Sequence, residues 1–252
     1  MITIKTPEEI QLMREAGRVV YDTLCLVEEH VRPGVTTWEL NRLADEYIRK
    51  CGAKPSFLHY NGYPFSICAS VNDAIVHGFP NKRRLEEGDI VSIDVGSCLK
   101  GYQGDAARTF PVGQISPEAQ KLIDVTRECF FEALKVAKEN MRIGDIGAAV
   151  QTHAESHGYS VVRELVGHGI GKHMHEPPDV PNFGNAGRGL RLVTGMCIAI
   201  EPMINAGKRH VCQLDDGWTI VTADGKLSAH YENTIAIVGD TPQILTMPEE
   251  SL

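Results

Sequence analysis

The chain has 252 residues, of which 42% are hydrophobic and 23% are charged, and it carries a formal net charge of -8. These values are typical of a soluble globular protein with one large or two small domains. The acidic balance argues against binding along a nucleic-acid backbone, which needs a basic face, so we expect no DNA partner. We interpret the one basic cluster, Lys82–Arg84, as a solvated loop and not as an RNA contact.

Compartment and redox state follow from what the sequence lacks. No apolar run approaches the length of about 18 residues that a membrane span needs, so we expect no membrane association. No signal-peptide pattern precedes the first predicted helix, which favours a cytoplasmic location. The seven cysteines show no close pair and are odd in number. This predicts reduced, mostly buried thiols, with neither a disulfide framework nor a zinc ribbon.

Two helices are predicted near the N-terminus. Thr6–Glu9 has a hydroxyl cap, a proline at the first helical position and a glutamate three residues after the cap, which is typical of a helix start. Apolar periodicity then continues toward a stop at Pro33–Gly34. A second helix is capped by Thr36 or Thr37 and ends near Cys51–Gly52.

The same pattern returns about 110 residues later. Ser116–Glu118 opens a long helix that Arg142–Gly144 breaks, and Asp145 is predicted to cap another helix, which ends at His157–Gly158. Two strands also correspond, because Gly88–Asp94 and Gly195–Glu201 both read glycine, two residues, aliphatic, small, isoleucine, carboxylate.

The spacing between these corresponding features indicates an internal duplication. The strands are offset by 107 residues, the glycine breaks at Gly34 and Gly144 by 110, and those at Gly52 and Gly158 by 106. We therefore predict one α+β domain, residues 1–252, built of related halves at roughly 1–111 and 112–252. Each half has two helices followed by antiparallel strands. The two strands would then bring Asp94 and Glu201 together near a pseudo-twofold axis.

Asp94 and Asp105 are predicted to lie on one hairpin. With the turn centred on Leu99–Lys100, the two carboxylates would be directly opposed, about 4.5–5.5 Å apart at Cβ. Such a pair repels unless one carboxyl is protonated or a dication lies between them. The alternative is that Arg108 neutralises both carboxylates in a surface ion pair.

A second acidic pair is predicted in the C-terminal half. Asp216–Gly217 is a strong turn signal between Glu201 and Glu232. Strands at Ile198–Pro202 and Ala229–Ile235 can then pair so that the two glutamates converge. Four carboxylates at one buried point would require metal.

Residues 168–178 add three histidines among glycines and prolines. A strand is predicted at Tyr159–Val162. His168, flanked by glycines that permit a close approach, fits a metal ligand. His173 and His175 would share a face of an extended chain, so spacing alone does not separate their roles.

Together these residues resemble a known family. The order and context of the acids and of His168, with Asn72–Gly78 and Ile200–Pro202, are similar to the dinuclear site of the bacterial, type I methionine aminopeptidases, which are M24 metallopeptidases: Asp94, Asp105, His168, Glu201 and Glu232. The resemblance implies the pita-bread fold and removal of N-terminal methionine before a small second residue. The short segment between His168 and Glu201 leaves no room for the large insertion of type II.

The resemblance also implies a role for each site residue. Asp94 chelates one ion, Asp105 and Glu232 bridge both, and His168 and Glu201 complete the second. A water or hydroxide that bridges the ions attacks the peptide bond, and Glu201 transfers the proton. The remaining assignments are that His77 and His175 contact the substrate while His173 has no counterpart.

A pocket for the methionine side chain is implied as well, lined by Phe57, Tyr60, Tyr63, Cys68, Met174 and Trp218. The chain departs from many relatives at two positions, with Phe57 in place of Cys and Asn233 in place of His. The first is expected to narrow the pocket and the second to alter how Glu232 is oriented.

Further implications concern cofactors and partners. The oxygen-rich ligand set favours two Mn(II), Fe(II) or Co(II) ions, with Zn(II) also compatible, and the family has a monovalent cation site near Asn72, Ala74 and Ser228. The expected substrates are nascent polypeptide N-termini, with transient ribosome association by a monomer. The rival readings are a prolidase or aminopeptidase P-like enzyme, a binding protein without catalysis, and a plain α/β domain with surface acids.

Overall fold

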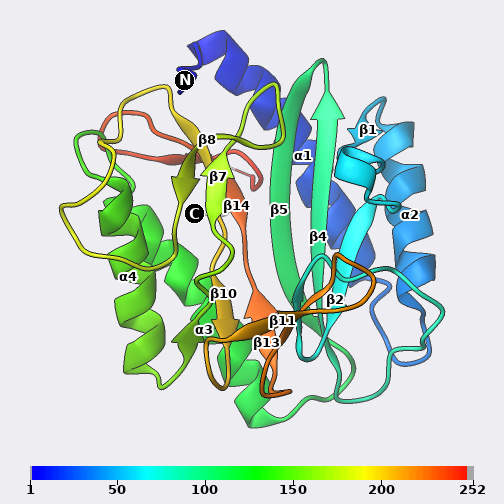
Figure 1. Cartoon of the computed structure of the whole chain (residues 1–252). Coiled ribbons are helices and arrows are strands. Elements are labelled where there is room, and N and C mark those ends of the chain that lie inside the picture. The colour runs from blue at the N-terminus through cyan, green and yellow to red at the C-terminus, as the bar shows by residue number, and fades with distance from the viewer. Residues whose placement is uncertain (1, 249–252) are drawn as a thin grey trace.

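Four α-helices and a series of short and long strands make up residues 2–248, which the computed structural model describes (Figure 1). The helices are α1 (Pro7–Glu28), α2 (Thr37–Lys50), α3 (Pro117–Val136) and α4 (Ile143–Ser156). The strands of the first half are β1 (Lys54–Pro55), β2 (Ile67–Val71), β3 (Ala74–Val76), β4 (Ile90–Leu99) and β5 (Tyr102–Pro111). Those that follow are β6 (Ser160–Val161), β7 (Gly167–Gly169), β8 (Glu176–Val180), β9 (Cys197–Ile200), β10 (Met203–Asn205), β11 (Val211–Gln213), β12 (Ile220–Thr222), β13 (Ser228–His230), β14 (Asn233–Ala236) and β15 (Gln243–Ile244).

Both helices of the first half begin where the sequence predicts. Thr6 accepts the backbone N–H of Glu9 at 3.3 Å, and the Glu9 carboxylate accepts the N–H of Thr6 at 3.0 Å. Thr36 and Glu39 form the same reciprocal pair, so Thr36, not Thr37, caps α2. A capping box satisfies two backbone donors that a helix start leaves free.

The helices of the second half differ from the prediction in their bounds. The long helix α3 is capped by Ser116 but ends at Val136, before Arg142. The cap of α4 is Arg142, and the predicted cap, Asp145, is the third residue of the helix, where its carboxylate accepts the Arg142 N–H at 2.7 Å. The predicted cap lies three residues beyond the actual one, because a carboxylate can satisfy free N–H groups of a helix start either from the cap or from the third helical position.

The repeat of the two halves is visible in matching backbone bonds. The Gly34 N–H donates to Leu85 O at 2.8 Å, and the Asn140 N–H donates to Leu192 O at 3.0 Å. Gly34 and Asn140 both have positive φ, 91° and 69°. Asn140, and not Gly144, is therefore the counterpart of Gly34. Asparagine is among the few residues that tolerate this left-handed backbone, so the two positions match in conformation although their residue types differ.

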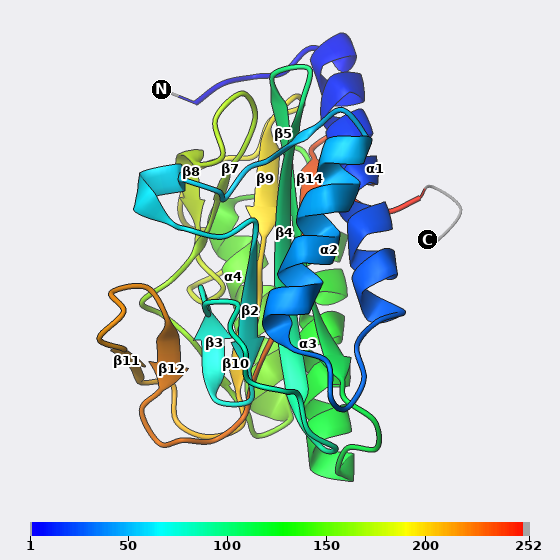
Figure 2. The ribbon, with the colours of Figure 1, turned by 90° about the vertical axis from the view of Figure 1, so that its right-hand side faces the viewer.

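Two sheets meet along β5 and β14. One has the order β1-β4-β2 with β5 paired to β4, and the other has the order β15-β14-β9-β7-β8. Ala107 and Glu232 exchange backbone hydrogen bonds of 3.3 and 3.0 Å across the junction. The helices cover one side of this central layer, while β3, β11 and β12 lie on the other (Figure 2). The predicted boundary near residue 111 and the single-domain reading stay predictions.

Two expectations from composition can be compared with the structure. No helix within residues 2–248 is long and apolar enough to cross a membrane. All seven cysteines are free, but only Cys68, Cys129 and Cys197 are buried, and Cys51 and Cys212 are exposed. The prediction of mostly buried thiols was therefore wrong, since some of these cysteines occupy helix ends and hairpin surfaces.

Candidate metal centre

Asp94 and Asp105 lie on the β4–β5 hairpin, in a register that differs from the prediction. Asp94 is opposite Ala107, and Asp105 is opposite Gly96. The turn is Lys100–Gly101, with φ of 53° and 84°. A two-residue hairpin turn of this kind needs positive φ at both positions, and this places the glycine second and moves the turn one residue along. The two carboxylates are therefore diagonal neighbours on one face of the hairpin, not directly opposed.

Glu201 and Glu232 are opposed as predicted. The β9–β14 register pairs Ile200 with Asn233, and the β10–β13 register pairs Met203 with His230. Both registers, when continued, put Glu201 opposite Glu232. The hairpin of β11 and β12 turns around Asp216–Gly217, which confirms that prediction.

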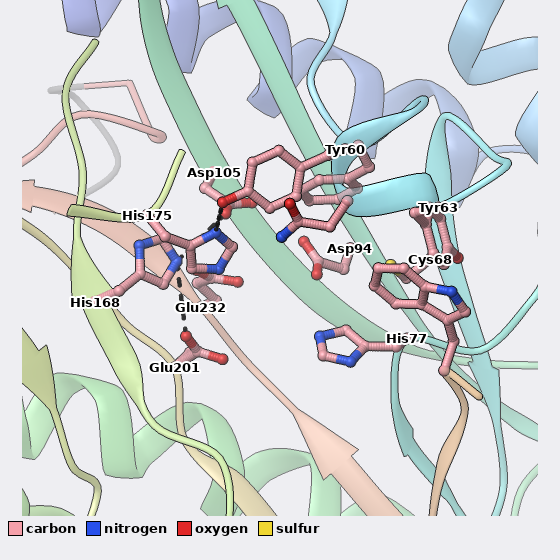
Figure 3. A pocket seen from close by; sticks show the side chains of 13 residues that line it. Tyr60, Tyr63, Cys68, His77, Asp94, Asp105, His168, His175, Glu201 and Glu232 are labelled. Atoms are coloured by element: carbon pink, nitrogen blue, oxygen red, sulfur yellow. Dashed lines mark hydrogen bonds and ion pairs between the residues drawn. The ribbon is translucent and has the colours of Figure 1, made fainter. Parts of the chain in front are cut away.

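His168 reaches the carboxylates because glycines flank it on β7. A Cβ on Gly167 would lie 2.4 Å from Ala199 O, and one on Gly169 would lie 2.3 Å from Pro177 O, so only glycine permits this packing. The His168 Nδ1 atom contacts Gly169 O at 2.8 Å. Its Nε2 lies 3.7 Å from an Asp105 oxygen and 3.9 Å from a Glu201 oxygen (Figure 3).

The four carboxylates form an electrostatically strained group. Asp105 and Glu232 are buried, and Asp94 and Glu201 are partly exposed to the cavity. Burial raises the pKa of Asp94 to about 7. Burial, together with the neighbouring carboxylates, also raises the pKa of the other three. One oxygen of Asp94, of Asp105 and of Glu232 has no hydrogen-bond partner within the described chain. Such a set fits divalent cations, which neutralise the charge and use the unpaired oxygens.

His230 also faces this group and was missed by the sequence analysis. It is 2% exposed, and its Nε2 lies 3.7 Å from oxygens of both Glu201 and Glu232. Burial lowers its pKa to about 3, so the imidazole is neutral. Its position two residues before Glu232 could have predicted this, because residues two apart on an extended strand point to the same face.

The remaining histidines of interest surround the same space. His175 Nδ1 lies 2.8 Å from the Tyr60 hydroxyl, and its ring centroid is 4.1 Å from that of His168. His77, in a left-handed backbone conformation, lies on the other side of the cavity (Figure 3). Burial lowers the pKa of both, that of His77 to about 4. His173 is exposed and is not among the residues that line the cavity.

The cavity above the carboxylates has a volume of about 370 Å³ and an aromatic wall. Its lining includes five of the six predicted pocket residues: Phe57, Tyr60, Tyr63, Cys68 and Trp218. Met174 does not line it but packs behind, in the same apolar cluster as Phe57. Asn61, which the sequence analysis did not single out, lines the cavity as well.

Arg108 does not neutralise the aspartates. Its guanidinium donates to the carbonyl oxygens of Ala107 and Glu232 and to the Asn233 side-chain oxygen, the last at 2.6 Å. Arg108 lies over the Tyr231 ring, 4.1 Å from its centroid. The alternative of a surface ion pair is therefore wrong, and Arg108 instead joins the Asn233 side chain to the backbone oxygen of Glu232.

The predicted cation-site residues are brought partly together. The Ser228 N–H donates to Asn72 O at 2.9 Å, which joins two of them. Ala74 lies nearby on β3, where it pairs with Val221. Asn72 has positive φ, 58°, and its side chain accepts the Ile90 N–H.

The geometry agrees with comparisons to known proteins. A model of metallopeptidase family M24 matches residues 11–238. Methionine aminopeptidase from Clostridium perfringens is 56% identical over 247 residues, which cover 98% of this chain and 99% of the relative. The crystal structure of methionine aminopeptidase from Rickettsia prowazekii superimposes with a TM-score of 0.97 at 43% identity, covering 98% of this chain and 100% of that one.

A more distant structure bears on the fold alone. Prolidase from Pyrococcus furiosus superimposes with a TM-score of 0.78 at 23% identity, covering 98% of this chain and 66% of its own. The predicted pita-bread fold and the predicted family are confirmed. The chain belongs to metallopeptidase family M24 and, within it, to the methionine aminopeptidases.

Proposed function

We propose that this chain removes the N-terminal methionine of nascent polypeptides with two divalent ions held by five side chains: Asp94, Asp105, His168, Glu201 and Glu232. The observation that carries the proposal is their convergence at the base of one cavity, with carboxylate oxygens left without protein partners. Bound cations would neutralise this buried group and relieve the repulsion between its carboxylates. Mn(II), Fe(II) or Co(II) suits the oxygen-rich set, with Zn(II) also compatible.

The residue roles proposed here are those that the family resemblance implies. Asp94 would hold one ion, Asp105 and Glu232 would contact both, and His168 and Glu201 would hold the second. Support for a shared Glu232 comes from its presence in two groups of side chains at the cavity, Asp94–His230–Glu232 and Asp105–His168–Glu232, whose ligand atoms lie within 4.8 Å of one another. When bound, two divalent ions supply Lewis acidity, which polarises the scissile carbonyl and lowers the pKa of water toward neutrality.

The protein's own groups handle the proton and the substrate. Glu201 accepts a proton from the attacking water and delivers it to the leaving amine. His175 and His77, neutral because burial lowers their pKa, hydrogen-bond the scissile amide from opposite sides. The aromatic wall holds the thioether, because sulfur–aromatic contacts contribute about 0.3–1.5 kcal/mol each.

The setting of the reaction is part of the proposal. Its substrates are N-termini with a small second residue, which implies work in the cytoplasm and transient contact with ribosomes. The enzyme acts as a monomer, and a monovalent cation binds near Asn72, Ala74 and Ser228. The contact between Asn72 and Ser228 supports the last assignment.

A peptide assay tests the proposal. Metal-loaded protein is expected to release methionine from Met-Ala-Ser and to leave Met-Lys-Ser and X-Pro peptides largely intact. Preferential X-Pro cleavage would support a prolidase instead. The absence of cleavage with every divalent metal would support a binding protein of the same fold.

A further inference from the structure

We propose that His230 is a sixth protein ligand of the metal centre and binds the ion on the Asp94 side through Nε2. This inference rests on the proposed two-ion site and adds to it a second nitrogen donor. His168 then supplies the nitrogen of one ion and His230 that of the other.

The distances around His230 match those around His168. His230 Nε2 lies 3.7 Å from Glu201 Oε2 and 3.7 Å from Glu232 Oε2. His168 Nε2 lies 3.7 Å from Asp105 Oδ2 and 3.9 Å from Glu201 Oε1. These separations are too long for hydrogen bonds. The His230–Glu232 and His168–Asp105 separations suit donors that each lie about 2.0–2.2 Å from a common ion, which puts the donors roughly 3–4 Å apart. The His230–Glu201 separation would then join donors of the two neighbouring ions.

His230 has no other partner for this nitrogen. Within residues 2–248, Nε2 is buried and accepts or donates no hydrogen bond. The residue is 2% exposed, so water does not substitute freely for a missing partner. A buried polar atom left unpaired destabilises the folded protein, and a bound cation would remove that cost.

The two imidazoles belong to separate groups of potential ligands. Asp94, His230 and Glu232 offer donor atoms within 4.8 Å of one another, and so do Asp105, His168 and Glu232. Glu232 is common to both groups. Each of the two ions would therefore share Glu232 and gain one imidazole of its own.

The backbone holds His230 in this position. Its N–H donates to Thr109 Oγ1 at 2.9 Å, and the same hydroxyl donates to His230 O at 2.9 Å. Thr109 lies on β5, the strand that carries Asp105. The imidazole is thus tied to the junction where the two halves meet, two residues before Glu232 and on the same face.

The charge balance also favours a neutral sixth ligand. Four carboxylates already offset the charge of two dications, so a further carboxylate would leave the buried site anionic. A neutral imidazole adds a donor without adding charge. It also shifts the ligand set toward metals that favour nitrogen, such as Fe(II), Co(II) and Zn(II), relative to a carboxylate-only position.

Proton NMR of the Co(II)-loaded protein tests the assignment, because the N–H of a coordinated imidazole gives a strongly shifted, solvent-exchangeable signal. The wild type with two ions bound is expected to show two such signals. His230→Gln should remove one and His168→Gln the other, while His173→Gln, at an exposed position, should remove neither. One signal in the wild type, or two that both survive His230→Gln, would overturn the proposal.

Metal affinity provides a second readout that does not depend on activity. In a calorimetric titration of the metal-free protein, His230→Gln is expected to weaken one binding step at least about tenfold, and His173→Gln to leave both steps unchanged. Unchanged binding in His230→Gln would overturn the sixth ligand and leave the five-ligand site intact. A wild type that binds no divalent ion would instead overturn the proposed function itself.

Discussion

The two carboxylate oxygens of Glu201 face different histidines. One of its oxygens lies 3.9 Å from His168 Nε2 and the other 3.7 Å from His230 Nε2. The side chain therefore stands between the two imidazoles and faces the cavity. Glu232 also lies close to both histidines but is buried, whereas Glu201 is partly exposed to the cavity. This exposure supports the proposed role of Glu201 in proton transfer.

Glu201→Gln is expected to lower kcat by about 10²–10⁴-fold, since the amide cannot accept the proton. The protein should remain folded because the substitution removes charge from a crowded anionic group. Steady-state rates on Met-Ala-Ser and circular dichroism check both statements. Glu155→Gln, on the exposed face of α4, serves as the control. A rate close to that of the wild type would show that another group transfers the proton.

Phe57 lines the aromatic wall of the cavity. A Cβ on Gly96 would lie 2.8 Å from Phe57 and 2.8 Å from Met174, so the ring is packed tightly against β4. Phe57→Cys is expected to raise KM for a methionyl peptide up to about tenfold through lost sulfur–aromatic contact. A norleucine peptide, without sulfur, should be affected less. Equal KM values in variant and wild type would place the methionine side chain elsewhere.

At the residue scale, the structure brings the four predicted acids and His168 together at one cavity, because their positions in the sequence are spaced by whole elements of the fold. His230 escaped prediction for a physical reason. Its proposed role depends on which face of β13 it occupies and on its 3.7 Å distance to Glu232. Both are set by the pairing of β13 with β10, which the local sequence does not reveal. The position of Met174 behind the cavity could not be predicted either, because a residue that lines a pocket and one that packs behind it can both be apolar.

At the scale of the elements, an ion pair joins the N-terminal segment to the end of the loop that carries His175. Lys5 Nζ lies 2.8 Å from Glu176 Oε2, and both side chains are 6% exposed. Burial alone would raise the pKa of Glu176, but hydrogen bonds from Lys5, Thr3 and the His173 N–H lower it to about 2. This ion pair therefore fixes one end of the 168–176 loop.

Glu176→Gln is expected to destabilise the protein by about 3–5 kcal/mol at pH 7, since it leaves the Lys5 charge buried and unpaired. The folded-state pKa lies below the unfolded value of about 4.3, so the wild-type advantage is full above that pH and disappears as the pH falls toward 2. Urea unfolding of both metal-free proteins at pH 7 and pH 3 measures the difference. A difference that does not shrink at pH 3 would mean that the ion pair is not its source.

Helix starts were predicted correctly where the capping motif allows only one position for each of its residues. The caps of α1 and α3 are such cases, because the hydroxyl and proline occupy fixed positions. The β4–β5 turn was misplaced by one residue because the preference of Gly101 for positive φ outweighed the symmetry of the acidic pair. That shift changed opposed carboxylates into diagonal ones without changing the face they share.

For the whole molecule, the duplication accounts for most of what the sequence predicts. Matched bonds at Gly34 and Asn140, and matched φ values of 92° and 91° at Gly88 and Gly195, show one backbone plan used twice. The convergence of acids follows from joining two copies along β5 and β14. The two copies are joined by backbone hydrogen bonds between Ala107 and Glu232. These bonds cannot be predicted from the sequence, because every non-proline residue offers the same backbone donor and acceptor.

Bound cations should therefore stabilise the whole chain. At a hundredfold excess over Kd, each ion contributes about 2.7 kcal/mol, which corresponds to a rise in Tm of roughly 5–10 °C for a chain of this size. Chelation should reverse the rise. Wild type and a double variant, Asp94→Asn with Glu232→Gln, form the matched pair.

Calorimetric titration of the metal-free chain with Mn(II) or Co(II) tests the convergence of the four carboxylates most directly. Two ions are expected to bind per chain, with both binding steps weakened or lost in the double variant and the rise in Tm lost with them. Failure of the wild type to bind any divalent ion, or unchanged binding of two ions by the double variant, would contradict a metal centre formed by Asp94, Asp105, Glu201 and Glu232.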